Sequence, residues 1–122
     1  MEEYAEVMRR TLDLAETCIE GLRFISNRLD EGLMEETVYL LEDVLYGFCQ
    51  ITNSIHILEV FLEDHELVDI TTKVELAIQD IVFTYECEDI NSASSRMNGL
   101  LLPAFNSWNE GMISTFHPHI LS

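Results

Sequence analysis

Basic residues are scarce in this sequence. Six Lys and Arg stand against 23 Asp and Glu, which gives a formal net charge of −17 over 122 residues. Proteins that bind a nucleic-acid backbone need clustered Lys and Arg to displace counterions from the phosphates, and an anionic membrane surface attracts the same cations. The composition therefore predicts a chain that binds neither nucleic acid nor a membrane.

Signals for export and for a disulfide framework are also lacking. The three cysteines, Cys18, Cys49 and Cys87, are an odd number at wide spacings, which is typical of reduced thiols. Residues 1–6 are acidic where a secretory signal is basic, and no apolar run approaches the roughly 18 residues of a membrane span. We therefore expect a soluble, cytoplasmic protein.

With two prolines and five glycines, the sequence has few residues that break helices or form turns. Hydrophobic residues make up 48% of the chain, which is enough for a core. At this length we expect one domain over residues 1–122, with a short C-terminal tail from about residue 117.

Apolar residues recur at alternating spacings of three and four, the period of amphipathic helices. Four helices are expected, near residues 3–29, 34–62, 66–87 and 92–116. Their links are short, which makes neighbouring helices antiparallel. The predicted fold is an all-α, antiparallel up-down-up-down four-helix bundle. Its expected core contains Leu22, Ile25, Phe48, Ile51, Ile55, Val74, Ile78, Ile81, Phe105 and Trp108.

Two glycines occupy matching positions in the first two helical segments. Residues 21–27 align with residues 47–53, with Gly, Ile and Asn identical and Ser matched by Thr. A glycine inside a helix costs about 1 kcal/mol relative to alanine. Gly21 and Gly47 therefore predict a close crossing of the two helices, the alternative being a chance likeness of two amphipathic helices.

The fourth helix carries the internal helix breaker, Pro103. It predicts either a kink in this helix near Gly99 or a split, with Pro103 as the first residue of a fifth helix. The preceding joint offers Asp89, Asn91 or Ser92 as an N-cap, since each side chain can accept a hydrogen bond from a free backbone N–H group.

Motifs of catalysis are missing. The sequence has no phosphate-binding glycine loop, no paired CxxC and no HExxH. A di-iron bundle needs Glu-x-x-His on two helices, whereas His56 precedes Glu59 in the reverse order and the pattern occurs once. We predict a protein that is not an enzyme and has no cofactor, with a metal-binding bundle that uses His56, Glu59 and His65 as the alternative.

Apolar residues away from the core line and acidic residues near one helix joint form the candidate partner-binding set. A helix that is apolar on nearly all sides is either central in its bundle or covered by another chain, as a dimer seam or as a groove for a partner helix. The apolar candidates are Tyr39, Tyr46, Val60, Leu76 and Phe83. The acidic candidates are Glu59, Glu63, Asp64, Glu66 and Asp69.

In size, acidity and helical content, and in a late tryptophan, Trp108, the chain resembles the small acidic all-helical chaperones that hold flagellar or secreted subunits in bacteria. The resemblance rests on these gross features and on no residue motif. It implies a chaperone-like function.

The functional hypothesis is a non-enzymatic, acidic protein-binding module, chaperone-like or regulatory. Its negative charge would attract a basic or amphipathic segment of a protein partner. A further alternative is an acidic DNA-mimic inhibitor, although the carboxylates gather at helix joints rather than at regular spacings. The apolar stripes also predict a homodimer, with Tyr39 or Tyr46 in its seam.

Overall fold

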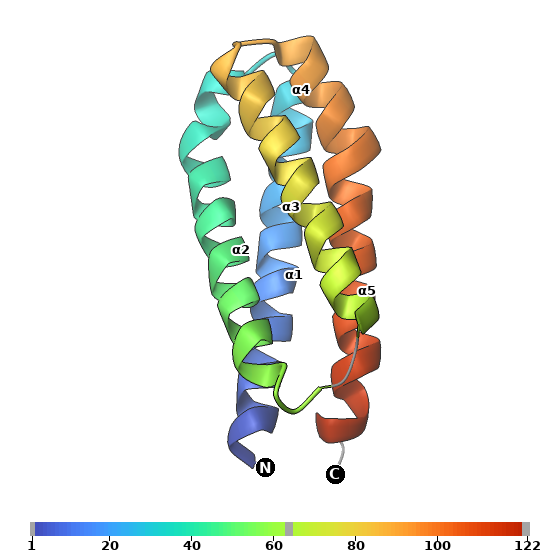
Figure 1. Ribbon diagram of the computed structural model, residues 1–122. Coiled ribbons are helices and arrows are strands. Elements are labelled where there is room, and N and C mark those ends of the chain that lie inside the picture. Colours follow the sequence, from blue (N-terminus) through green and yellow to red (C-terminus); the bar gives the residue numbers. More distant parts are fainter. Residues whose placement is uncertain (1, 63–64, 121–122) are drawn as a thin grey trace.

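The computed structural model describes residues 2–62 and 65–120, and the side chains of these residues except 2, 3 and 65. In these ranges the elements are helices: α1 (Glu2–Asp30), the 3₁₀ helix η1 (Met34–Thr37), α2 (Val38–Leu58), α3 (His65–Glu86), α4 (Ile90–Arg96), the π-helix η2 (Met97–Leu101) and α5 (Leu102–Ile120). Because α4, η2 and α5 follow one another directly, the chain forms four antiparallel rods (Figure 1). The predicted four-helix bundle is confirmed.

The four rods are not packed equally closely. Helix α1 packs against α2 and α5, and α3 packs against α4 and α5. The backbones of α2 and α3 approach each other at fewer points than those of the other neighbouring rods. The seam between α2 and α3 is therefore the open side of the bundle.

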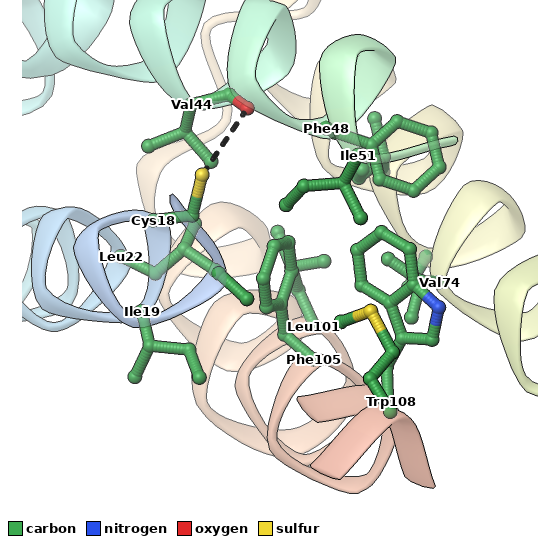
Figure 2. Packing of buried hydrophobic residues seen from close by; sticks show 14 of the residues in the cluster. Cys18, Ile19, Leu22, Val44, Phe48, Ile51, Val74, Leu101, Phe105 and Trp108 are labelled. Carbon is green, nitrogen blue, oxygen red and sulfur yellow. Dashed lines mark hydrogen bonds between the residues drawn. The ribbon is translucent and has the colours of Figure 1, made fainter. Parts of the chain in front are cut away.

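Every residue of the expected core is buried, at less than one tenth exposure. Trp108 lies at the centre of this core, with its ring 5.2 Å from that of Phe48 and 5.1 Å from that of Phe105 (Figure 2). The buried indole N–H needs a partner and donates a hydrogen bond to Thr71 Oγ1 at 2.8 Å. Trp108 of α5 thereby contacts both α2 and α3.

The predicted close crossing of the first two helices is confirmed. A Cβ atom on Gly47 would lie 2.6 Å from Cys18 Sγ, and one on Gly21 would lie 3.1 Å from Val44 Cγ2. The Cys18 thiol points across the crossing to the Val44 carbonyl oxygen at 4.0 Å (Figure 2). Burial raises the pKa of Cys18 to about 11, which makes this thiol a packing group rather than a nucleophile.

Near Pro103, where a kink or a split was predicted, the structure has a widened π-helical turn over Met97–Leu101, and α5 begins at Leu102. Leu102 donates its backbone N–H to Met97 O, five residues back, which is the pattern of a π-helix. Proline has no N–H, and its ring clashes with the carbonyl of the fourth residue before it in a regular helix. The widened turn lets the rod continue through Pro103 instead of ending there.

Several expected helix ends are wrong by a few residues. The second helix ends at Leu58 instead of residue 62, so Val60 follows it in a turn. The last helix continues to Ile120, through the region that was expected to be a tail. Phe116 is fully buried there, and Arg9 donates to the Ile120 carbonyl at 3.4 Å. These contacts with the bundle hold the last turns in place.

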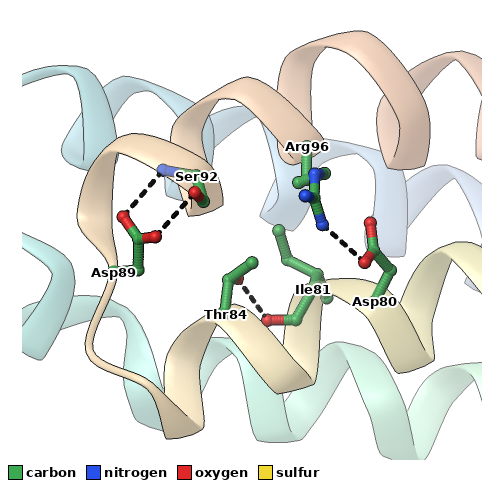
Figure 3. A network of polar contacts seen from close by, with 6 residues as sticks. All are labelled: Asp80, Ile81, Thr84, Asp89, Ser92 and Arg96. Atoms are coloured by element: carbon green, nitrogen blue, oxygen red, sulfur yellow. Dashed lines mark hydrogen bonds and ion pairs between the residues drawn. The ribbon is translucent and has the colours of Figure 1, made fainter.

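The joint between α3 and α4 has the predicted type of cap. Asp89 is the N-cap of α4, and its carboxylate accepts hydrogen bonds from the Ser92 backbone N–H at 3.1 Å and from Ser92 Oγ at 2.7 Å (Figure 3). The bonds from Ser92 lower the pKa of Asp89 below its ordinary value. Arg96 of α4 also pairs with Asp80 of α3 at 2.6 Å, which ties the two helices together.

Candidate partner-binding groove

A groove follows the seam between α2 and α3. Its upper pocket is lined by the first turns of α2 and the last turns of α3, the segments at the top of the bundle in Figure 1. This pocket has a volume of about 330 Å³. Its apolar lining comes from both helices, with Val38, Leu41 and Leu45 on α2 and Val82 and Tyr85 on α3. The remaining two lining residues, Glu42 on α2 and Glu86 on α3, are both exposed. The upper pocket is thus an apolar slot with one carboxylate from each wall.

The lower pocket continues the seam toward the chain termini, with a volume of about 350 Å³. The buried side chains of Phe48 and Ile55 contribute to its lining, and the half-exposed Val68 lies on the α3 side. The other lining residues are polar or sulfur-bearing: Cys49, Thr52, His56, Glu59, Thr71, Thr72 and Glu75. This part of the seam offers more hydrogen-bonding groups than the upper pocket.

An end pocket of about 480 Å³ lies where the seam meets the top of the bundle. It shares Val38 and Tyr85 with the upper pocket, so the two are neighbours. The residues that line it are Gly32, Leu33, Met34, Glu35, Glu36, Val38, Tyr85, Glu88 and Ile90. The groove therefore extends from the side of the bundle onto its end.

Tyr85 is held in place at the boundary between the upper pocket and the end pocket. Its hydroxyl lies 2.6 Å from Thr37 Oγ1, and Thr37 Oγ1 donates to the Met34 carbonyl at 2.6 Å. Because the single hydroxyl proton of Thr37 is used in that bond, the Tyr85 hydroxyl is the donor to Thr37. Burial raises the pKa of Tyr85 above its ordinary value. The ring is thus a fixed, neutral part of the groove wall.

Trp108 of α5 contacts both walls of the lower pocket. Its indole ring packs on Phe48 of α2, while its N–H group binds Thr71 of α3. Phe48 and Thr71 both line the lower pocket. A single side chain of α5 therefore contacts a residue on each wall of the lower pocket.

The charged groups that line the three pockets are acidic. They are Glu35, Glu36, Glu42, Glu59, Glu75, Glu86 and Glu88. No Lys or Arg lines these pockets in the described part of the chain. Arg9 and Arg10 lie near Glu6, Arg28 pairs with Glu31, and Arg96 pairs with Asp80. The groove thus carries negative charge along its length, apart from His56, which is charged only when it is protonated.

The apolar candidates from the sequence are exposed but do not line these pockets. Tyr39 is 80% exposed, Tyr46 68%, Val60 96%, Leu76 59% and Phe83 62%. The alternative that they are buried centrally in the bundle is therefore wrong. Helical spacing places Tyr39 and Tyr46 on the outer face of α2, with the exposed Ile57 further along the same face.

The acidic candidates are spread over several places. Glu59 lines the lower pocket, and Glu66 and Asp69 are exposed in the first turns of α3. Glu63 and Asp64 lie outside the described residues. The sequence-based set therefore contains one acidic residue of the groove, Glu59.

The alternative metal ligands are brought together only in part. His56 Nδ1 lies 3.2 Å from Glu59 Oε2, an exposed pair that is ionic when His56 is protonated. The side chain of His65 is outside the described set. Within the residues that the structure describes, no group of three or more His, Cys, Asp or Glu side chains is placed to hold a metal ion.

The groove residues that the sequence analysis missed flank the core positions of their helices. Leu45 and Val82 are half-buried, and the carboxylates of Glu42 and Glu86 lie near them at the rim of the upper pocket. The available signal was the width of the apolar stripe on both helices. That width alone does not distinguish residues that meet across a closed seam from residues that line an open one.

Comparisons with known proteins give one match. A family model described as a domain of unknown function (DUF8042) matches residues 6–111, a range that includes every residue lining the three pockets. Neither the curated proteins nor the solved structures gave a match. In the described residues, no helix is both long enough and apolar enough to cross a membrane.

Proposed function

We propose that this chain, which belongs to the family described as a domain of unknown function (DUF8042), is a non-enzymatic protein-binding module, chaperone-like or regulatory, that holds a basic amphipathic segment of a partner. One observation carries the proposal: a groove between α2 and α3 with an apolar upper pocket, in which every Asp, Glu, Lys or Arg that lines the three pockets, among the described residues, is a glutamate. The three free cysteines are consistent with work in a reducing compartment such as the cytoplasm.

Two physical effects would act on such a partner. Apolar side chains that enter the groove leave water, which contributes about 25 cal/mol for each Å² buried. The negative field of the bundle attracts cationic segments from a distance and raises the association rate more than the affinity. An amphipathic helix in a groove combines both effects, with apolar anchors at helical spacing and polar residues outside.

A second surface supports the proposal of a homodimer. Tyr39, Tyr46 and Ile57 on the outer face of α2 are each at least 60% exposed and lie outside the three pockets. Exposed apolar side chains gathered on one helix face are typical of protein interfaces. A twofold dimer through this face would cover them and leave the α2–α3 groove free for the partner.

Binding to a designed probe tests the module function directly. The probe is a fluorescent amphipathic helix of about 18 residues, or five turns, with leucine on one face and lysine on the other. Its controls are a peptide of the same composition in scrambled order and a peptide with glutamate in place of lysine. We expect the amphipathic lysine peptide to bind most tightly, and to bind more weakly at about 500 mM than at about 50 mM NaCl.

The controls separate a specific groove from a general attraction between opposite charges. Equal affinity for the ordered and the scrambled peptide would show that charge alone is recognised. Binding of the glutamate peptide as tight as that of the lysine peptide, or no binding of either, would contradict the proposed function.

A further inference from the structure

We infer that the upper pocket binds a single large apolar side chain of the partner helix, with a Lys or Arg about one turn before it and another about one turn after it. This inference rests on the proposed function and specifies the ligand at one part of the groove. Its basis is the shape and charge of the upper pocket, whose apolar lining is accompanied by Glu42 and Glu86.

The size of the pocket supports one anchor residue. Its volume of about 330 Å³ is at the lower end of the range for small-molecule sites, and one leucine, methionine or aromatic side chain is the fitting occupant. The slot has two distinct walls, with Leu41 and Leu45 on α2 and Val82 on α3. The Tyr85 ring, held by its bond to Thr37, also lines the slot.

The two carboxylates at the upper pocket support a Lys or Arg on each side of the anchor residue in the partner helix. Glu42 and Glu86 come from opposite walls of the pocket, so the carboxylates belong to different helices. On a bound helix, residues three or four positions before and after the anchor lie on its side of the helix. Lys or Arg at these positions has a long flexible stem that can reach an exposed carboxylate on either wall.

Paired variants of the protein test this assignment. Glu42→Gln with Glu86→Gln removes both carboxylates at the pocket, and Glu16→Gln with Glu20→Gln removes two exposed carboxylates on α1 with the same change in net charge. With the lysine peptide at low salt, we expect about 3- to 10-fold weaker binding for the pocket pair. The α1 pair should weaken peptide binding by less than about half of the fold-change seen for the pocket pair.

Blocking the pocket tests the anchor. Val82→Trp places a large ring in the slot and should weaken binding by about tenfold or more, as should replacing the peptide's anchor leucine by alanine. Ile113→Trp, at an exposed position of α5, is the matched control. Circular dichroism melts show whether each variant is folded, and the peptide substitution tests the anchor without altering the protein.

The outcomes distinguish this inference from the proposed function. If the peptide binds in the expected order but the pocket and control variants behave alike, the module function stands and the assignment to the upper pocket is overturned. If Val82→Trp changes a dimer into a monomer and leaves peptide binding unaffected, the pocket holds a second copy of this chain, and the inference is wrong. If no peptide binds, the proposed function itself fails.

Discussion

At Gly47, a single methyl group has no room, because a Cβ atom there would lie 2.6 Å from Cys18 Sγ in the crossing of α1 and α2. We expect Gly47→Ala to lower the free energy of unfolding by about 1–3 kcal/mol, the usual cost of an overpacked core. This loss should occur although alanine favours a helix by about 1 kcal/mol over glycine. Urea denaturation followed by circular dichroism measures the difference.

Gly99 provides the matched control for this substitution. Nothing lies within 4 Å of a Cβ atom built on Gly99, so Gly99→Ala should stay within about 1 kcal/mol of the original chain. Adding Cys18→Ala to Gly47→Ala removes the obstructing sulfur and should recover part of the loss. Equal stabilities of the Gly47→Ala and Gly99→Ala proteins would contradict a tight crossing.

At the scale of the elements, the α3–α4 joint depends on the charged form of Asp89. Hydrogen bonds from Ser92 lower the pKa of Asp89 in the folded state below its ordinary value of 3.8. A lowered pKa contributes stability above the unfolded value, and this contribution is lost as the pH falls through the folded value. We therefore expect Asp89→Ala to melt at a lower temperature than the original chain at pH about 7. The difference should shrink at pH about 2.

Asp89→Asn separates the charge of this cap from its hydrogen bonds. Asparagine keeps a side-chain oxygen that can accept from the Ser92 N–H, so its melting temperature at neutral pH should lie between those of the original chain and Asp89→Ala. Thermal melts of the three proteins across the acidic range measure this order. A difference between the original chain and Asp89→Ala that stays constant down to pH about 2 would show that the carboxylate charge contributes nothing.

At the scale of the whole molecule, the outer face of α2 determines the expected assembly. We expect a homodimer of about 28 kDa at moderate salt, twice the 14.1 kDa of one chain. Tyr46→Glu puts a charge at a position that is 68% exposed and should give the monomer mass without loss of fold. Size exclusion with light scattering, at micromolar concentrations, makes the measurement.

Ile113→Glu is the control for the dimer, because it introduces the same charge at an exposed position on α5 and should leave the dimer intact. The same measurement is repeated at several NaCl concentrations. The net charge of −17 opposes association, and salt that screens this charge should favour the dimer. A mass of 14.1 kDa for the original chain at all concentrations and salt levels would refute the dimer.

Periodicity and composition were sufficient for the features that each helix carries by itself. The spacing of residues such as Leu22, Phe48 and Ile81 identified the core, because a helix directs positions three and four apart to the same side. The matched positions of Gly21 and Gly47 predicted the close crossing. Glycine lowers the stability of a helix, and this cost is offset where a neighbouring helix needs the space that a side chain would fill. The acidity of the surface follows from the composition alone.

Helix ends were harder to predict from the sequence, because contacts between residues that are distant in the sequence decide where a helix ends. Burial of Phe116 and the bond from Arg9 to Ile120 keep α5 helical past residue 116, although Pro118 interrupts its hydrogen bonds. At Pro103, local rules allowed either a kink or a split. The bundle accommodates the proline by a π-turn that keeps both halves of the rod packed in the core.

The groove itself depends on tertiary structure. A helical pattern shows which side of α2 and which side of α3 are apolar, but the distance between the two helices depends on how all four rods pack together. Trp108 of α5 packs on Phe48 and binds Thr71 in the lower pocket, and the upper pocket lies between α2 and α3 at the other end of their seam. Helical periodicity and composition thus account for the bundle, its core and its negative charge. Whether Leu45 and Val82 line a pocket or close a seam is a property of the tertiary structure, because it depends on how closely α2 and α3 approach each other in the bundle.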